Sequence, residues 1–226
     1  MTSHTYSLIG RCERTGMLGV ALTTSSIAVT ARCVWIEANA GAVTTQNVTD
    51  PRLGPQLLDT LEAGAAAATA VDRVAAAAPH RDHRQLAALD ASGEAGAFTG
   101  AQALGCNGHR RGMDCLAAGN LLANEQVLDA VVRGFEEAPD EHLGGRLVRA
   151  LAAGRETSPV RSAGLLMAAS VPWPVADLRV DWHDDPVGEL SELWELWEPQ
   201  LDDYVTRALD PERAPAFGLA GDERSR

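Results

Sequence analysis

The stretch Thr5–Asn47, TYSLIGRCERTGMLGVALTTSSIAVTARCVWIEANAGAVTTQN, decides the fold that we expect for this chain. Two apolar runs, Tyr6–Gly10 and Met17–Thr23, flank the charged segment 11–16, which ends in glycine. Short apolar runs with β-branched or aromatic residues on either side of a glycine-containing turn are typical of a β-hairpin. A third extended run, Gly41–Thr45, follows. The sequence therefore predicts that the protein opens with the strands of an antiparallel sheet.

The composition limits the classes of protein to which the chain can belong. Its 226 residues are enough for one domain with its own core, which we expect at 1–214, with a loosely attached tail at 215–226. The formal net charge of −12 argues against nucleic acid as a partner, because phosphates would repel the protein. Every basic residue is arginine, which argues against Schiff-base chemistry and a lysine-assisted nucleophile.

The sequence shows no targeting, membrane or metal-binding pattern. The N-terminus has no charged region followed by an apolar stretch, and no run approaches the ~20 apolar residues of a membrane helix. The four cysteines form no C-x-x-C pair, and neither a P-loop nor a dinucleotide-binding glycine pattern is found. We therefore expect a cytoplasmic protein with reduced cysteines and no cofactor, metal or membrane partner.

The rest of the chain alternates blocks of strands with helices. Apolar residues at helical spacing predict the helices, with Asn124 as the N-cap of one of them. The glycine- and arginine-rich stretch 100–112 has little periodicity and is expected to be a loop. This order favours antiparallel sheets covered by helices over an alternating βαβ fold. The expected helices are 54–63, 65–78, 124–137, 142–153 and 187–209, the last interrupted near Pro199, and the later strands are 83–91, 94–99, 114–122, 161–169 and 175–182.

Hydroxyl side chains at the start of the chain are the first candidates for catalysis. Thr5 and Ser7 are two residues apart on the expected strand and therefore point to the same face of the sheet. If the chain were cut before Thr5, the free α-amine of that residue, with a pKa of about 8, would act as the base for its own hydroxyl. The alternative is that both are ordinary residues of a strand edge and that only Met1 is removed.

A second group of polar side chains is expected to bind the substrate. Four consecutive hydroxyls follow the hairpin, and they include Ser25 and Ser26. Arg32 follows closely enough to bind a substrate carboxylate through two parallel hydrogen bonds. Ser162, at the start of a buried strand, is a further candidate. Each of these residues has a structural alternative as part of a turn or cap.

Asparagines at strand ends would complete such a site. Asn47 and Asn120 each follow an apolar run, where an amide can donate to an oxyanion, an interaction worth about 3–4 kcal/mol. Asparagine is also common at turns. His183 stands beside carboxylates, but the Asp-Asp-Pro run at 184–186 is typical of a helix start, which is the interpretation we favour. A triad that includes His183 stays open, because triads are spatial and not sequential.

Short phrases spread over most of the chain form a pattern through their order and spacing. In these phrases the chain resembles the domain of unknown function 1028 (DUF1028) family, a bacterial group placed in the N-terminal-nucleophile (Ntn) hydrolase superfamily. The resemblance implies a four-layer α-β-β-α sandwich of two antiparallel sheets between helix layers. It also implies hydrolysis or transfer of linear C–N amide bonds, with Thr5 at the position of the superfamily nucleophile. The phrases include TYSLI (5–9), QNVTDPRLGP (46–55), AGNLL (118–122), RSAGLL (161–166) and LRVDWHDDP (178–186).

Three functional hypotheses follow. The first is an amidohydrolase that uses a hydroxyl nucleophile on a small polar substrate of the acyl- or carbamoyl-amino-acid type. The second is a protein that binds a small metabolite without turnover, and the third is an oligomeric structural protein. We expect a homodimer or higher homo-oligomer under each hypothesis, because large apolar side chains on the last helix, Trp194 and Trp197 among them, usually meet a partner.

Overall fold

The structure, a computed structural model, describes residues 4–155 and 159–217. Its strands are β1 (Thr5–Arg11), β2 (Leu18–Thr24), β3 (Val34–Glu37), β4 (Gly41–Asn47), β5 (Arg84–Asp90), β6 (Ala95–Thr99), β7 (Cys106–Gly112), β8 (Cys115–Leu122), β9 (Ser162–Ala168) and β10 (Pro174–Val180). Its helices are α1 (Thr30–Cys33), α2 (Leu53–Glu62), α3 (Ala67–Ala77), α4 (Gln126–Glu136), α5 (Leu143–Ala153), α6 (Pro186–Trp197) and α7 (Leu201–Leu209), with short 3₁₀ turns η1 (Arg81–His83) and η2 (Glu198–Gln200).

The strands form two antiparallel sheets. Sheet A has the order β10-β9-β2-β1-β8-β7, and sheet B has the order β3-β4-β5-β6. The β1–β2 hairpin predicted from the sequence is present, with Thr5 paired to Thr24 and Arg11 paired to Leu18. The expected α+β class with two antiparallel sheets is therefore confirmed.

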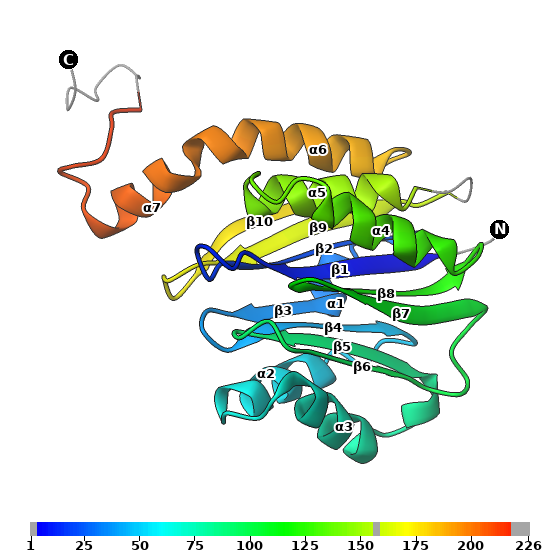
Figure 1. Cartoon of the computed structure of the whole chain (residues 1–226). Helices are drawn as coiled ribbons and strands as arrows, with labels where there is room; N and C mark the ends of the chain where they lie inside the picture. The colour runs from blue at the N-terminus through cyan, green and yellow to red at the C-terminus, as the bar shows by residue number, and fades with distance from the viewer. Residues whose placement is uncertain (1–3, 156–158, 218–226) are drawn as a thin grey trace.

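Helices cover the outer faces of both sheets (Figure 1). In Figure 1, α4, α5 and α6 lie over sheet A, and α2 and α3 lie over the far side of sheet B. Alternation along β1 shows how the layers are filled: Tyr6 and Leu8 pack among the helices over sheet A, whereas Ile9 packs between the sheets. A third apolar cluster, with Val71 and Leu86, joins sheet B to α2 and α3.

The layer between the two sheets changes character along its length. At one end it is apolar, with Ile9, Val20 and Leu116 packed together. At the other end the same strand faces carry buried polar side chains. We call this second region the polar end; it contains Ser7 of β1, Thr24 of β2, Thr44 and Gln46 of β4, Gln85 of β5, Asn120 of β8 and Ser162 of β9.

Two local predictions differ from the structure, and two short elements were not predicted. The expected loop at 100–112 contains β7, an edge strand whose residues are mostly exposed or half-buried, so the sequence carries no apolar alternation there. The predicted cap at Asn124 is wrong, because α4 begins two residues later and has no side-chain cap. The short elements α1 and β3 were not predicted, since each has only four residues.

The C-terminal helical segment is divided as the sequence indicates, into α6, η2 and α7 around Pro199. Figure 1 shows α7 extending beyond the edge of the layers. Of the predicted tail, 215–217 is described and Phe217 contacts Tyr204 of α7, while 218–226 lies outside the described residues. Within the described part of the chain, no helix has the length and apolar character needed to cross a membrane.

Candidate functional site

A small polar pocket of about 240 Å³ lies at the polar end. It is formed by the start of β1, the end of β2, the loop that follows, α1, and the end of β4. Arg32 is the charged side chain among the described residues that line the pocket. The lining residues are Thr5, Thr24, Ser26, Val29, Arg32, Cys33, Gln46, Asn47 and Thr49.

Thr5 is held at the pocket by the strand pairing on both of its sides. It is the first residue of β1 and is paired with Thr24 of β2 and with Asn120 of β8. Its Oγ1 lies 2.7 Å from Oγ1 of Thr24, so one hydroxyl donates to the other. The residue is half-buried, and its side chain faces the same layer as Ser7.

The loop after β2 is fixed by hydrogen bonds to its backbone. Ser162 Oγ donates to the carbonyl oxygen of Ser26 at 2.7 Å and accepts from the N–H of Val29 at 3.2 Å. Arg32 Nη1 donates to the carbonyl oxygens of Ile27 and Ala28, at 2.6 and 2.9 Å. Within the described residues Arg32 forms no salt bridge, so its charge is available to an anionic ligand.

A cluster of three amides orients the wall of the pocket. Gln85 Nε2 donates to the carbonyl oxygens of Gly119 and Gly108, at 2.9 and 3.2 Å, which fixes its Oε1 as an acceptor. That oxygen accepts from Nδ2 of Asn120 at 3.0 Å and from Nε2 of Gln46 at 3.1 Å. Gln46 Oε1 is then left as a buried acceptor with no partner among the described residues.

Asn47 ties the end of β4 to two loops. Its Nδ2 donates to the carbonyl oxygen of His83 at 2.5 Å, and its Oδ1 accepts from the N–H of Leu104 at 3.0 Å. The residue has a φ of 70°, in the left-handed region that asparagine tolerates better than most residues. One hydrogen on Nδ2 is left for another acceptor.

The structure brings together half of the residues that the sequence nominates. Thr5, Ser26, Arg32 and Asn47 line the pocket. Ser7, Asn120, Ser162 and Ser25 do not. Ser7 is fully buried and lies 3.5 Å from the carbonyl oxygen of Ala118, Asn120 belongs to the amide cluster, Ser162 holds the loop, and the Ser25 N–H donates to the carbonyl oxygen of His4 at 3.1 Å.

Sequence analysis missed several lining residues, of which Gln46 is the most informative. The sequence held a signal for it: Ala42, Thr44 and Gln46 occupy alternate positions of one strand and therefore share a face of the sheet. In the structure all three side chains are buried. Cys33 was also missed. Burial raises the pKa of its thiol above the usual value, an effect larger than the opposite effects of the Thr49 hydrogen bond and the Arg32 charge. Cys33 is therefore a poor nucleophile at neutral pH.

The carboxylates beside His183 serve the helix start. Asp185 Oδ1 accepts from the N–H of Gly188 at 3.0 Å and caps α6, as the sequence indicates. This bond, together with Arg155, lowers the pKa of Asp185. His183 Nδ1 accepts from the N–H of Asp185, and His183 is not among the residues that line the pocket.

The fold and the site together define an α+β protein of two facing antiparallel sheets, with a small cationic pocket lined by hydroxyls at the end of its first strand. The sequence matches the model described as "Family of unknown function (DUF1028)" over residues 5–190, and the chain belongs to this family.

Comparison with solved structures supports that assignment. The chain is 32% identical to a DUF1028 protein from Silicibacter pomeroyi, whose crystal structure matches with a TM-score of 0.80 over 85% of this chain and 88% of the other. Anbu, the ancestral beta-subunit from Yersinia bercovieri, aligns over 95% of this chain and 100% of its own, with 10% identity and a TM-score of only 0.36. No curated protein matches the sequence.

Proposed function

We propose that this protein is an amidohydrolase that cleaves the linear C–N bond of a small N-acyl- or N-carbamoyl-amino-acid-type substrate, with Thr5 as the nucleophile. The observation that carries the proposal is the placement around one pocket of the Thr5 hydroxyl, of Arg32, and of Oε1 of Gln46, where Arg32 has no ion pair and Gln46 Oε1 no hydrogen bond among the described residues. A substrate of this type has a carboxylate for the arginine and an amide N–H for the glutamine.

The size and charge of the pocket support a small anionic substrate. A cavity of about 240 Å³ is slightly below the usual range for drug-sized ligands, roughly 300–1,000 Å³. Arg32 is held at its Nη1 by two carbonyl oxygens, so its guanidinium is already oriented when a carboxylate arrives. A fixed guanidinium that binds a carboxylate in bidentate fashion supplies orientation as well as affinity.

The nucleophile requires a base, and the described lining residues include no histidine or carboxylate. The α-amine of Thr5 would supply one after cleavage of the His4–Thr5 bond. In that cleavage the Thr5 hydroxyl adds to the carbonyl carbon of His4, the C–N bond breaks to free the amine, and water hydrolyses the resulting ester to release residues 1–4. The Ser25 N–H, 3.1 Å from the carbonyl oxygen of His4, would stabilise the negative charge that develops there.

Turnover then follows the same chemistry on the substrate. The Thr5 amine takes the hydroxyl proton, the oxygen attacks the amide carbon, and the proton passes to the leaving nitrogen as the C–N bond breaks. Water hydrolyses the acyl ester and regenerates Thr5. The Thr24 hydroxyl, 2.7 Å away, fixes the direction of the nucleophile.

The test is the intact mass of the purified, tag-free protein, followed by hydrolysis assays on N-acyl- and N-carbamoyl-amino acids. We expect a chain that begins at Thr5, and Thr5→Ala should abolish both cleavage and hydrolysis. Ser25→Ala is the matched control, because it removes a neighbouring hydroxyl that does not line the pocket while keeping the backbone N–H. A mass that shows loss of Met1 alone would sink the mechanism.

A second candidate function is binding of the same class of anion without turnover. It is favoured by the packing of the residue before Thr5, since His4 is buried and its ring stacks on Tyr6. If the chain stays intact and still binds N-acyl-amino acids through Arg32, this second function replaces the first.

A further inference from the structure

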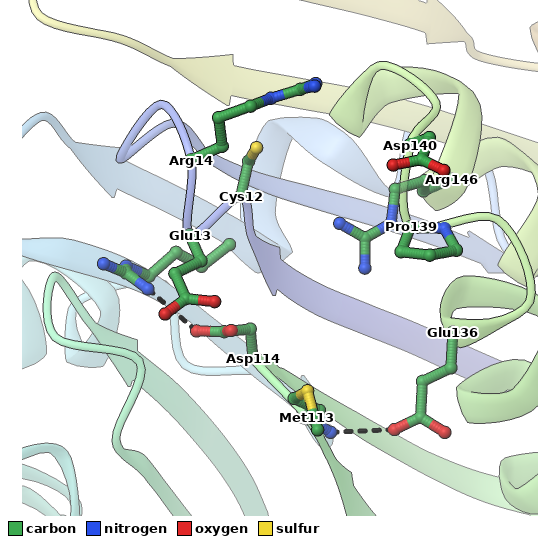
Figure 2. Close-up of a pocket in the computed structure, with 10 residues that line it drawn as sticks. Cys12, Glu13, Arg14, Met113, Asp114, Glu136, Pro139, Asp140 and Arg146 are labelled. Carbon is green, nitrogen blue, oxygen red and sulfur yellow. Dashed lines mark hydrogen bonds and ion pairs between the residues drawn. The ribbon is translucent and has the colours of Figure 1, made fainter.

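A second cavity, of about 490 Å³, lies at the opposite end of β1 from Thr5 (Figure 2). Six residue steps at ~3.3 Å each place its nearest residue on that strand, Arg11, about 20 Å from Thr5. The cavity is enclosed by the turn between β1 and β2, the turn between β7 and β8, and the connection between α4 and α5. Its volume falls within the usual range for small-molecule sites, roughly 300–1,000 Å³.

Arg146 of α5 is the buried charged residue of this cavity. The residue is only 8% exposed. Its guanidinium carbon lies 3.8 Å from the centre of the Phe135 ring, and its Nε donates to the carbonyl oxygen of Phe135 at 3.2 Å. Figure 2 shows its guanidinium directed into the space between the turn at Cys12 and the carboxylate of Glu136. The position of the charged group is therefore fixed from one side and open on the other.

The described carboxylates that line the cavity do not form an ion pair with Arg146. Among the described residues it forms no salt bridge. Asp114 is paired with Arg11 at 2.9 Å instead. The thiol of Cys115 supplies no negative charge either, because burial and the charge of Glu136 raise its pKa to about 12. A buried guanidinium without an ion-pair partner is costly, so the side of Arg146 that faces the cavity favours an anionic ligand.

The rim of the cavity has the opposite sign. Once Arg11 and Asp114 are counted as a pair, the lining residues Glu13, Glu136 and Asp140 outnumber the remaining rim cation, Arg14. In Figure 2 the Arg14 side chain extends away from Glu13 and Glu136. A phosphate or a dicarboxylate would meet repulsion at this rim, whereas a ligand with a cationic end would be attracted to it.

From this charge arrangement we infer that the cavity binds a small amino carboxylate, a zwitterion whose carboxylate lies on Arg146 and whose ammonium group faces Glu136 and Asp140. The site is separate from the Thr5 pocket and does not depend on the function proposed for it. The exposed side chain of Met113, at the same rim, offers apolar contact to the chain between the two charged ends.

The test is a binding series measured by calorimetry and by thermal unfolding. The probes are glycine, L-leucine, γ-aminobutyrate and 6-aminohexanoate, which vary the separation of the two charges, with butyrate and butylamine as single-charge controls. At least one amino carboxylate should bind more tightly than both controls and raise the unfolding temperature. Failure of every amino carboxylate to bind at millimolar concentration would overturn the inference.

Substitutions of residues that line the cavity test whether the probes bind there. Arg146→Gln should weaken binding by about tenfold or more, because a charge-assisted hydrogen bond is lost. The double variant Glu136→Gln, Asp140→Asn changes two exposed residues and keeps Arg146, so we expect it to fold. It should weaken the binding of amino carboxylates but not that of butyrate, which would meet less repulsion at the rim. Arg32→Gln, in the other pocket, should leave the binding of these probes unchanged.

These binding experiments can fail or succeed independently of the hydrolysis assays proposed for the Thr5 pocket. If Arg146→Gln does not fold, the double variant and Arg146→Lys, which keeps the charge but loses the planar fork, carry the test. Full retention of amino-carboxylate binding in the double variant, or its loss in Arg32→Gln, would overturn the assignment. Protection of the Cys12 thiol from iodoacetamide by the bound probe, followed by peptide mass, gives an independent readout, because Cys12 lines this cavity.

Discussion

The hydroxyl oxygens of Thr5 and Thr24 lie 2.7 Å apart in the wall of the pocket at the polar end, and the register of the β1–β2 hairpin brings them together. We predict that Thr24→Val lowers the rate of hydrolysis at least tenfold, since the nucleophile loses the partner that fixes its direction, and destabilises the fold by about 1 kcal/mol. Initial rates and urea unfolding check these effects.

Thr23→Val is the matched control for this prediction. The Thr23 hydroxyl donates to the carbonyl oxygen of Ser162 and does not line the pocket. The control should lose a similar amount of stability and keep most of its activity. Equal losses of activity in the two variants would show that the Thr24 hydroxyl has no special role.

We predict that removal of the central glutamine of the amide cluster strongly destabilises the fold. Gln85→Leu removes the acceptor of two buried amides and the donor to Gly119, so we expect the free energy of unfolding to fall by about 2–4 kcal/mol. Urea unfolding of this variant is compared with that of Gln56→Leu, which changes an exposed glutamine of α2. A loss no greater than that of the control would mean that the cluster contributes nothing net.

A glycine behind α1 links packing to substrate binding. A Cβ at Gly164 would lie 2.0 Å from Thr30 Oγ1, so Gly164→Ala must shift the side chain of Thr30, which belongs to the same short helix as Arg32 and Cys33. We predict a loss of about 1–3 kcal/mol in stability and a larger rise in KM than fall in kcat for carboxylate substrates. Steady-state kinetics and urea unfolding provide both measurements.

Gly145→Ala serves as the control for that substitution. A Cβ there would meet its nearest neighbours at 3.5 Å, which is ordinary contact, and Gly145 is inside α5. Alanine should therefore be neutral or stabilising by roughly 0.5–1 kcal/mol. An unchanged KM in Gly164→Ala would contradict the link between that glycine and Arg32.

The pKa of Asp90 leads us to predict that the stability of the fold depends on pH. Burial acts to raise the pKa of its carboxyl, but hydrogen bonds from Ser92, Ala67 and Glu94 outweigh burial and lower it. Because the pKa is lower in the folded state, the contribution to stability is full above the unfolded pKa, about 3.9, and is lost as pH falls through the folded pKa.

We therefore predict that Asp90→Asn is less stable than the wild type at pH 7 and that the difference narrows as the pH falls below about 4. Urea unfolding at several pH values measures the difference. Asp72→Asn, at an exposed position of α3, should show no such convergence. A difference between Asp90→Asn and wild type that stays constant with pH would contradict the prediction.

The predictable parts of the fold are those with clear local patterns. The runs in β1 and β2 alternate around a glycine turn, and α6 starts at an Asp-Pro pair, so the sequence indicates both. In contrast, β7 takes its place from pairing with β8 and has almost no buried side chains. Its residues therefore carry no periodic signal that sequence analysis can detect.

The site was partly predictable for a similar reason. Thr5 and Arg32 have side chains whose chemistry stands out in a sequence, whereas the contact between Gln46 and Gln85 forms only when β4 pairs with β5. That pairing spans 39 residues of sequence and cannot be found from spacing. The far cavity was not predicted at all, because Arg146 appears in the sequence as one more cation on an amphipathic helix.

The graded layer between the sheets has an evolutionary consequence. The apolar end around Ile9, Val20 and Leu116 packs the two sheets together, while the polar end lies where the strands finish and the loops begin. Substitutions at Ser26, Arg32 or Thr49 do not change any side chain of the apolar end. Lineages that share this architecture can therefore diverge in what they recognise while inheriting the same scaffold.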